Sequence, residues 1–302
     1  MLRPHRRFIA LLLVLFLVPA CGDPPGEQEA DAQPSVVTSI FPLGDLIQWM
    51  VGDEVRVEVL LPIGASPHTF EVTPRQMQGL HGAGLFVMIG GGLDEWVARL
   101  PEASGGDPLV LRLSEGIALL AGDHDHGSGN PHIWLDPILV RDRILPTLQR
   151  ALKETLPQVA TGIEARTQAL SDSLTALDEE IRAALAPLDQ RAFVATHAAW
   201  TYFAERYGLE EVGVVHTHSG LDPSSREMAR LLEVARTRGV DCVFTEPQLG
   251  DVASRALASE LSLPTCILDP LGGPGLEDRD GYMQLLRFNT RQFVKGLGQG
   301  PG

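Results

Sequence analysis

Cysteine is scarce in this chain of 302 residues, which holds only Cys21, Cys242 and Cys266. The last two lie in apolar runs, where they could pair or remain two buried free thiols. Basic side chains are also in the minority, with 24 lysines and arginines against 39 acidic residues and a net charge of −15. Such a surface repels nucleic acid and mildly attracts cations, so we expect no nucleic-acid partner.

Long apolar runs are rare, and the one at the N-terminus, residues 8–18, is too short for a comfortable membrane span. Three arginines precede it and a small residue follows it, which predicts a secretory signal over residues 1–20. The sequence Val-Pro-Ala-Cys at 18–21 resembles a lipobox, so we expect lipidation of Cys21. The alternative is an ordinary signal with an incidental cysteine. Residues 21–34 lack apolar periodicity, as a flexible tether would.

The rest of the chain alternates short β-type runs with helical patterns. This alternation predicts parallel sheets covered by helices on both faces. We expect an α/β fold of two lobes, residues 35–156 and 188–302, each with a mainly parallel four-stranded sheet. A long rigid helix, residues 157–187, should join them, after a helical pattern interrupted at Pro146 and Pro157. The expected strands are residues 36–40, 55–61, 85–89, 109–113, 191–196, 212–215, 240–245 and 265–268.

Three polar residues stand where ligands bind in such sheets, beyond the carboxyl ends of the strands, and His132 is a fourth candidate. His68 follows the second predicted strand, His197 follows the fifth directly, and Asp269 follows the eighth directly. His132 lies between two prolines, just before a predicted helix. Any one of them could be an ordinary hydrogen-bonded loop residue. Their joint placement predicts one site in the cleft between the lobes.

The composition of this site predicts its chemistry. Three imidazoles and one carboxylate form a four-coordinate set suited to zinc, whereas a manganese site usually carries more oxygen. If all four ligands come from the protein, no position is left for an activated water. We therefore expect a protein that holds a metal and is not an enzyme.

Other polar residues are weaker candidates. His124 and His126 lie in a short polar loop, and His216 and His218 follow the sixth predicted strand. All four could be auxiliary metal contacts, with a solvated pair as the alternative for His216 and His218. Glu246 ends the seventh predicted strand, where it could support a ligating histidine or simply cap the next helix.

Six motifs together resemble those of the substrate-binding lipoproteins of zinc and manganese ABC importers, and they occur in the order that this family has. The resemblance covers the chain from about residue 36 to its end. The motifs are Pro-His-Thr-Phe-Glu (67–71), Gly-Gly-Leu-Asp-Glu-Trp (91–96), Asn-Pro-His-Ile-Trp-Leu-Asp-Pro (130–137), Thr-His-Ala-Ala-Trp-Thr-Tyr-Phe-Ala (196–204), Thr-Glu-Pro-Gln (245–248) and Leu-Asp-Pro-Leu-Gly (268–272).

This resemblance implies an exported monomer, anchored by lipid and facing the periplasm or the cell exterior. It implies two lobes joined by a rigid helix and a metal that is handed to a permease powered by an ATPase. The implied metal ligands are His68, His132, His197 and Asp269. Manganese-binding members commonly carry glutamate at the position of His197, which favours zinc here. Zinc-binding members often have a long histidine-rich loop where this chain has only residues 123–126.

Three alternatives remain at this point. The cargo could be manganese or iron. A zinc hydrolase would use Glu71 or Glu246 as its general base, although the chain has no His-Glu-x-x-His element. A metal-binding surface adhesin is compatible with the predicted anchor. For the transport reading, the long helix predicts small rearrangements on metal release and no wide hinge closure.

Overall fold

The computed structural model describes most of the chain after the predicted tether. The predicted signal, Cys21, His124, His126 and His218 lie outside the described residues. Within the described part, no helix is both long and apolar enough to cross a membrane. The described residues are 34–78, 80, 83–100, 108–121, 129–216 and 222–298.

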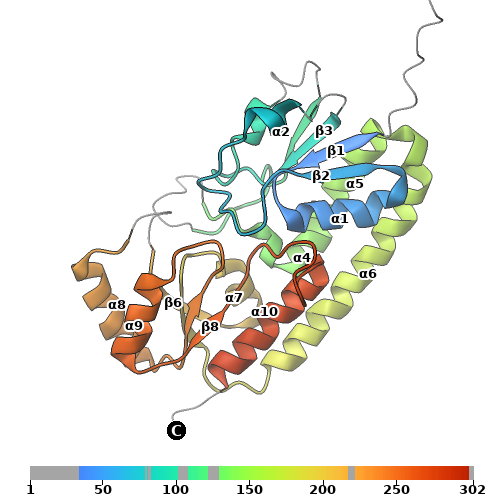
Figure 1. Cartoon of the computed structure of the whole chain (residues 1–302). Coiled ribbons are helices and arrows are strands. Elements are labelled where there is room, and N and C mark those ends of the chain that lie inside the picture. Colours follow the sequence, from blue (N-terminus) through green and yellow to red (C-terminus); the bar gives the residue numbers. More distant parts are fainter. Residues whose placement is uncertain are drawn as a thin grey trace, which may run out of the picture. The chain divides into compact units, whose positions relative to one another are not determined.

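The N-terminal lobe contains a sheet of four parallel strands in the order β2-β1-β3-β4. The central strand β1 is buried along its whole length and β3 is a nearly continuous run of buried apolar residues, as expected for strands covered on both faces. Helices α1, α2 and α5 accompany the sheet (Figure 1). The bounds are β1 Ser35–Thr38, α1 Phe41–Val51, β2 Arg56–Val59, α2 Pro74–Gln78, β3 Ala83–Met88, β4 Leu109–Arg112 and α5 Leu145–Thr155.

The C-terminal lobe repeats this arrangement, with four parallel strands in the order β6-β5-β7-β8. Each lobe therefore places its first strand beside its second and third. The carboxyl ends of β5, β7 and β8 lead into the loops that carry His197, Glu246 and Asp269. The bounds are β5 Ala192–Ala195, α7 Thr201–Tyr207, β6 Glu210–Val214, α8 Ser225–Arg238, β7 Val243–Thr245, α9 Val252–Leu261, β8 Thr265–Ile267 and α10 Tyr282–Leu297.

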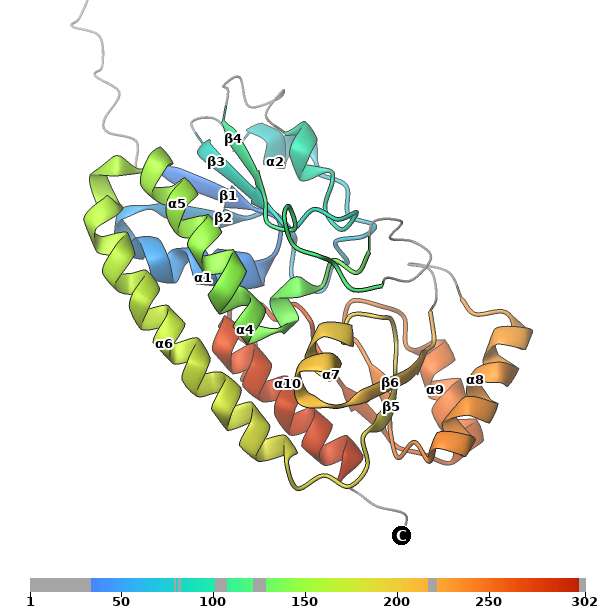
Figure 2. The same ribbon diagram turned by 180° about the vertical axis from the view of Figure 1, so that it is seen from behind.

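One long helix, α6 (Ala160–Leu185), packs on both lobes. Its 26 residues span about 39 Å at 1.5 Å per residue. It contacts α1 and α5 of the first lobe and α10 and α7 of the second, and Figure 2 shows it running along both. Its apolar residues recur at helical spacing and are buried, Ile163, Leu170, Leu174, Leu177, Ile181 and Leu185. The predicted fold, two parallel α/β lobes joined by a long helix, is confirmed.

One hydrophobic cluster extends through both lobes, and each lobe has a smaller cluster of its own. A single cluster of buried side chains includes Leu85 of the first sheet, Trp134 before α4 (Pro137–Leu139) and Phe244 of the second sheet. The indole of Trp134 donates to the carbonyl of Pro270 at 2.7 Å, and the hydroxyl of Tyr282 donates to the carbonyl of Trp134 at 2.7 Å. The polypeptide beside His132 is thus fixed by both lobes.

The segment after His132 differs from expectation at Pro146. We expected this proline to interrupt the helix, but α4 continues through a π-helical turn, Val140–Ile144, into α5. Pro146 lies in the first turn of α5. A missing N–H costs least there, because the π-helical turn just before it has already changed the hydrogen-bond pattern of the helix. Asp136 is the N-cap of α4 and accepts from the N–H groups of Ile138 and Leu139.

Candidate metal centre

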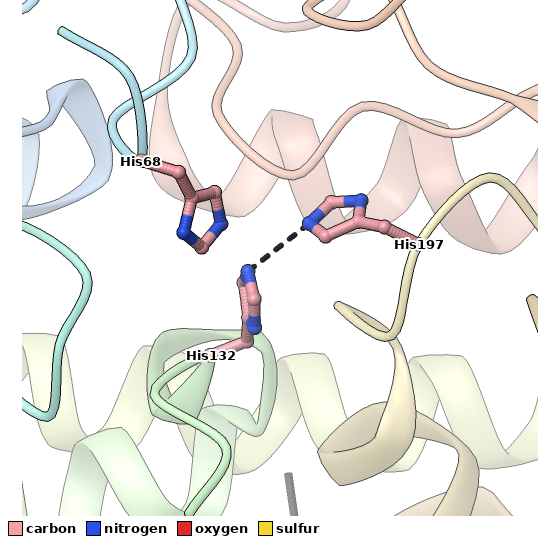
Figure 3. Close-up of side chains that lie close together, drawn as sticks. All are labelled: His68, His132 and His197. Carbon is pink, nitrogen blue, oxygen red and sulfur yellow. Dashed lines mark hydrogen bonds between the residues drawn. The ribbon is translucent and has the colours of Figure 1, made fainter. Parts of the chain in front are cut away.

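Three histidines from distant parts of the chain meet between the lobes. His68 comes from the loop after β2, His132 from the turn before α4, and His197 from the end of β5. One ring nitrogen of each lies within 4.8 Å of the others, and Figure 3 shows the three rings converging. The side chains of His132 and His197 are buried, and that of His68 is partly buried. This is the only group of three or more potential metal-binding side chains among the described residues.

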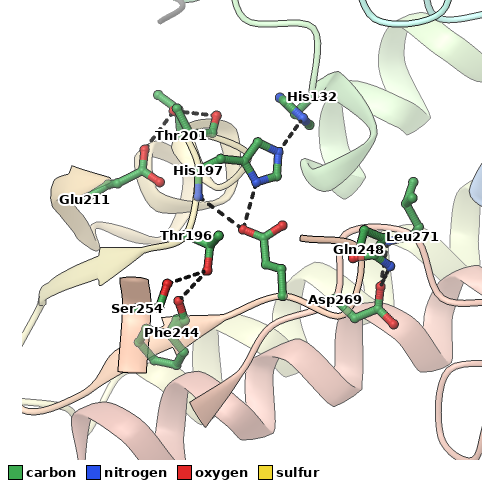
Figure 4. A network of polar contacts seen from close by, with 12 residues as sticks. His132, Thr196, His197, Thr201, Glu211, Phe244, Gln248, Ser254, Asp269 and Leu271 are labelled. Atoms are coloured by element: carbon green, nitrogen blue, oxygen red, sulfur yellow. Dashed lines mark hydrogen bonds and ion pairs between the residues drawn. The ribbon is translucent and has the colours of Figure 1, made fainter. Parts of the chain in front are cut away.

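Glu246 orients the ring of His197. Its Oε1 lies 2.8 Å from Nδ1 of His197, and the backbone N–H of His197 also points to it at 3.4 Å. A carboxylate accepts hydrogen bonds, so Nδ1 carries the hydrogen and Nε2 is left with its lone pair. Figure 4 shows this ring directed toward His132. Two roles were expected for Glu246, and the geometry favours the first, in which Glu246 holds the ring of a histidine. Glu246 itself is only 4% exposed.

Asn130 orients the ring of His132 in the same way. Its Oδ1 lies 2.8 Å from Nδ1 of His132 and accepts from the backbone N–H of the same residue at 3.0 Å. The hydrogen is therefore on Nδ1 and the lone pair on Nε2. Asn130 is the first residue of the motif at 130–137, but its role in orienting His132 was not foreseen. The signal was available, since an asparagine often bonds the backbone two residues on.

The two lone pairs face each other. Nε2 of His132 and Nε2 of His197 are 3.2 Å apart, and the dashed line in Figure 3 joins them. Two lone pairs repel at this distance unless a proton or a metal cation lies between them. The ring of His68 lies 5.5 Å from that of His132 and 5.7 Å from that of His197, measured between centroids. The two nitrogens of His132 and His197 are therefore placed to share a proton or a metal cation.

The cavity beside these rings is small. Its volume is about 10 Å³, roughly the space of one water molecule or ion. It offers no room for a larger ligand. Its walls come from both lobes and consist of Ser66, Pro67, His68, His132, Trp134, His197, Glu246, Gln248, Leu249, Pro270 and Leu271.

Asp269, the fourth predicted ligand, lies behind this wall. Its Oδ1 accepts from Nε2 of Gln248 at 2.7 Å and from the backbone N–H groups of Leu271 and Gly272 at 3.0 and 2.9 Å. Its Oδ2 pairs with Arg279 at 3.0 Å. The structure thus brings the three histidines together and directs the buried carboxylate of Asp269 to its own loop. No sequence signal links Arg279 to Asp269.

The remaining histidine candidate within the described residues is His216. It is buried directly after β6, and its backbone N–H donates to the carbonyl of Thr196 at 2.8 Å. It is not a member of the three-histidine group. An auxiliary metal contact at His216, or at the three histidines outside the described residues, stays a prediction.

A second acidic residue near His197 was not foreseen. Burial is the largest cause of a pKa of about 7 for Glu211; the nearby charge of Glu246 also raises this pKa, and a hydrogen bond from Thr201 and the proximity of His197 lower it. The hydroxyl of Thr201 donates to Oε2 of Glu211 at 3.0 Å. Figure 4 shows this pair on the far side of the His197 ring from Asp269. Glu211 is therefore a carboxyl group that titrates near neutral pH.

Comparison with known proteins gives consistent matches over nearly the whole described chain. The model of the family described as zinc-uptake complex component A, periplasmic, matches residues 36–296. The zinc-binding lipoprotein AdcA of Streptococcus pneumoniae serotype 4 is 26% identical over 310 residues, which cover 97% of this chain but 61% of AdcA. The chain therefore spans less than two thirds of the length of that relative.

Two further matches extend over whole proteins. The high-affinity zinc uptake system protein ZnuA of Bacillus subtilis is 27% identical over 300 residues, which cover 93% of this chain and 94% of ZnuA. A crystal structure of a ZnuA deletion mutant with zinc bound superposes with a TM-score of 0.80 at 30% identity. It covers 89% of this chain and 100% of that one.

Proposed function

The chain belongs to the zinc-uptake complex component A family, and on this premise we propose that it captures Zn²⁺ between its lobes and delivers it to an ABC importer. The observation that supports this most is the convergence of three imidazole nitrogens within 4.8 Å. Two of the three rings already have the tautomer that presents a lone pair to a metal. The site is therefore organised for nitrogen coordination before the ion arrives.

The donor atoms favour zinc over manganese as cargo. The three side chains that face one another offer nitrogen, which zinc accepts readily, whereas manganese prefers oxygen. The carboxylates nearby are engaged elsewhere, since Glu246 bonds His197 and Asp269 pairs with Arg279.

Asp269 remains our candidate for the fourth ligand. A single partner, Arg279, holds its Oδ2, while its Oδ1 is held by three hydrogen bonds. We propose that Oδ2 leaves Arg279 when zinc binds and that Oδ1 keeps the loop in place. Zinc would then have four protein ligands and no activated water, which is a site for holding and transporting a metal and not for hydrolysis.

We also propose that the protein is exported, that lipidation of Cys21 anchors it to the membrane, and that a permease with its ATPase receives the metal from the monomer. The N-terminal pattern of basic, apolar and small residues supports export. In cells that express a Cys21→Ser variant, the protein should move from the membrane to the soluble fraction. Retention in the membrane would contradict the lipid anchor but would not bear on the proposed metal site.

The metal assignment is tested with protein purified without added metal. Elemental analysis and competitive titration should give one zinc ion per chain, bound more tightly than manganese. The His68→Ala, His132→Ala, His197→Ala triple variant should lose this ion. A variant at exposed Arg230, Arg230→Gln, is the control and should bind zinc as the wild type does. Equal zinc binding by the triple variant, or tighter binding of manganese, would overturn the proposal.

A further inference from the structure

Asn130 is a buried amide, 1% exposed, whose every polar atom is bonded. Its Oδ1 accepts from both the backbone N–H and Nδ1 of His132. Its Nδ2 donates to the carbonyl of Ala198 at 2.6 Å and to the hydroxyl of Thr201 at 3.1 Å. The hydroxyl of Tyr202 donates to its carbonyl at 2.8 Å. The side chain therefore lies between a histidine of one lobe and the start of α7 in the other.

The orientation of this amide is fixed by its neighbours. The backbone N–H of His132 can only donate, and the carbonyl of Ala198 can only accept. Exchanging the amide oxygen and nitrogen would set donor against donor on one side and acceptor against acceptor on the other. Oδ1 therefore faces His132, and the hydrogen of that imidazole must be on Nδ1.

The other end of the amide holds the loop that carries His197. Ala198 directly follows His197, and its carbonyl receives the shorter of the two amide hydrogen bonds. One side chain thus determines the tautomer of His132 and ties it to the residue next to His197. The Nε2 atoms of His132 and His197 are 3.2 Å apart. They are the metal ligands that opposite lobes would contribute to the proposed zinc site.

We propose that Asn130 is a positioning residue that couples the two halves of the metal site. It presents Nε2 of His132 to the cation and fixes the spacing between His132 and His197 across the lobe boundary. This inference rests on the proposed function, because it concerns the same zinc ion. Zinc release then requires the hydrogen bonds from Asn130 to Ala198 and Thr201 to stretch or break.

The test separates the two ends of the amide. Asn130→Ala removes both, so zinc affinity should fall about 10- to 100-fold, as for other groups that orient metal-binding histidines. Nitrogen-15 NMR of His132 should then show a mixture of both neutral tautomers. Asn130→Asp keeps the acceptor for His132 and removes the donors to Ala198 and Thr201. It should restore the single tautomer, and the melting temperature of the zinc-free protein should fall, because a carboxylate oxygen would face the carbonyl of Ala198.

A matched control breaks another contact between the lobes. Arg206 of α7 forms a two-point ion pair with Asp136, at 2.9 and 2.7 Å, and this pair lies outside the three-histidine group. Arg206→Gln should lower the melting temperature of the zinc-free protein while zinc affinity and the His132 tautomer stay unchanged. A purely structural role for Asn130 would make Asn130→Ala resemble this control.

The outcomes are distinct. Wild-type zinc affinity and a single tautomer in Asn130→Ala would overturn the inference. So would a loss of zinc affinity in Arg206→Gln as large as that in Asn130→Ala at an equal loss of stability. If Asn130→Ala does not fold, a mixture of His132 tautomers or an unchanged melting temperature in Asn130→Asp overturns the inference by itself. Zinc binding by the triple-histidine variant would instead refute the proposed function.

Discussion

Oε1 of Glu246 lies 2.8 Å from Nδ1 of His197, and this contact directs Nε2 of the same ring toward His132. The carboxylate is buried at the end of β7, a strand beside the one that leads into His197. A buried carboxylate also offsets part of the positive charge that a dication brings to the site. Glu246 should therefore affect metal affinity without contacting the metal.

The first prediction concerns Glu246→Gln. Glutamine can still accept from Nδ1 of His197, but it carries no charge, so zinc affinity should fall about tenfold or more. Competitive titration with a zinc chelator measures the change. Glu233→Gln, at an exposed position on α8, is the matched control and should bind as the wild type does. Equal affinity in both variants would refute a role for Glu246 at the site.

The second prediction concerns Arg279, which holds Oδ2 of Asp269 in the zinc-free protein. Arg279→Met should destabilise the zinc-free protein by about 2 kcal/mol, because a buried carboxylate loses a charged hydrogen-bond partner. The freed oxygen should make zinc bind more tightly, since no ion pair has to open first. Urea unfolding and chelator competition measure the two effects. If zinc affinity stays the same or falls, Asp269 is not the fourth ligand.

The third prediction is a pH dependence of stability from Glu211. Burial raises its folded-state pKa to about 7, above the usual value of about 4.3 for an unfolded glutamate. Between these values the folded state holds a proton that the unfolded state has lost, so the contribution of this group to stability falls as pH rises. Glu211→Gln removes the effect and should become more stable relative to the wild type between pH 4.5 and 7, by roughly 1 to 3 kcal/mol.

Urea unfolding at pH 4.5 and 7.5 tests this on zinc-free protein. Glu260→Gln, at an exposed position on α9, is the control and should follow the wild type at both values. A wild type and a Glu211→Gln variant that differ by the same free energy at both pH values would show that Glu211 has no raised pKa.

The fourth prediction concerns the size of the motion on zinc release. α6 packs on both lobes and the core continues between them, so the distance between lobes should change by less than about 2 Å. Spin labels at exposed Glu54 and Glu233, one per lobe, allow this distance to be measured with and without zinc. A shift of many ångströms would indicate hinge closure and contradict the rigid-helix expectation.

Much of the fold could be predicted because its signals are local. Apolar runs such as the one in β3 and helical spacing along α6 report burial directly. His68 and His197 could be found because ligands bind beyond the carboxyl ends of parallel strands, and His132 because it lies between two prolines just before a predicted helix. The Pro146 segment was predicted wrongly because a π-helical turn depends on neighbouring helices and not on sequence pattern alone.

The finer geometry of the site could not be read from the sequence. Asp269 stands at the right strand end, yet which way its carboxylate turns depends on Arg279 and on the Leu271 and Gly272 backbone. Those contacts depend on the conformation of the loop after Asp269, where a shift of about 1 Å is enough to make or break a hydrogen bond. The burial that raises the pKa of Glu211 is likewise a property of packing around β6. Position along the chain predicts which residues meet, but not which of their atoms do.

The hydrophobic cluster that joins the two sheets has a thermodynamic consequence. Because Leu85, Trp134 and Phe244 belong to one cluster, loss of tertiary structure in one half should expose apolar side chains of the other. The protein should melt in a single calorimetric transition, and an isolated half should be insoluble or unfolded. An ion held at the junction would then raise the melting temperature of all residues from β1 to α10 together.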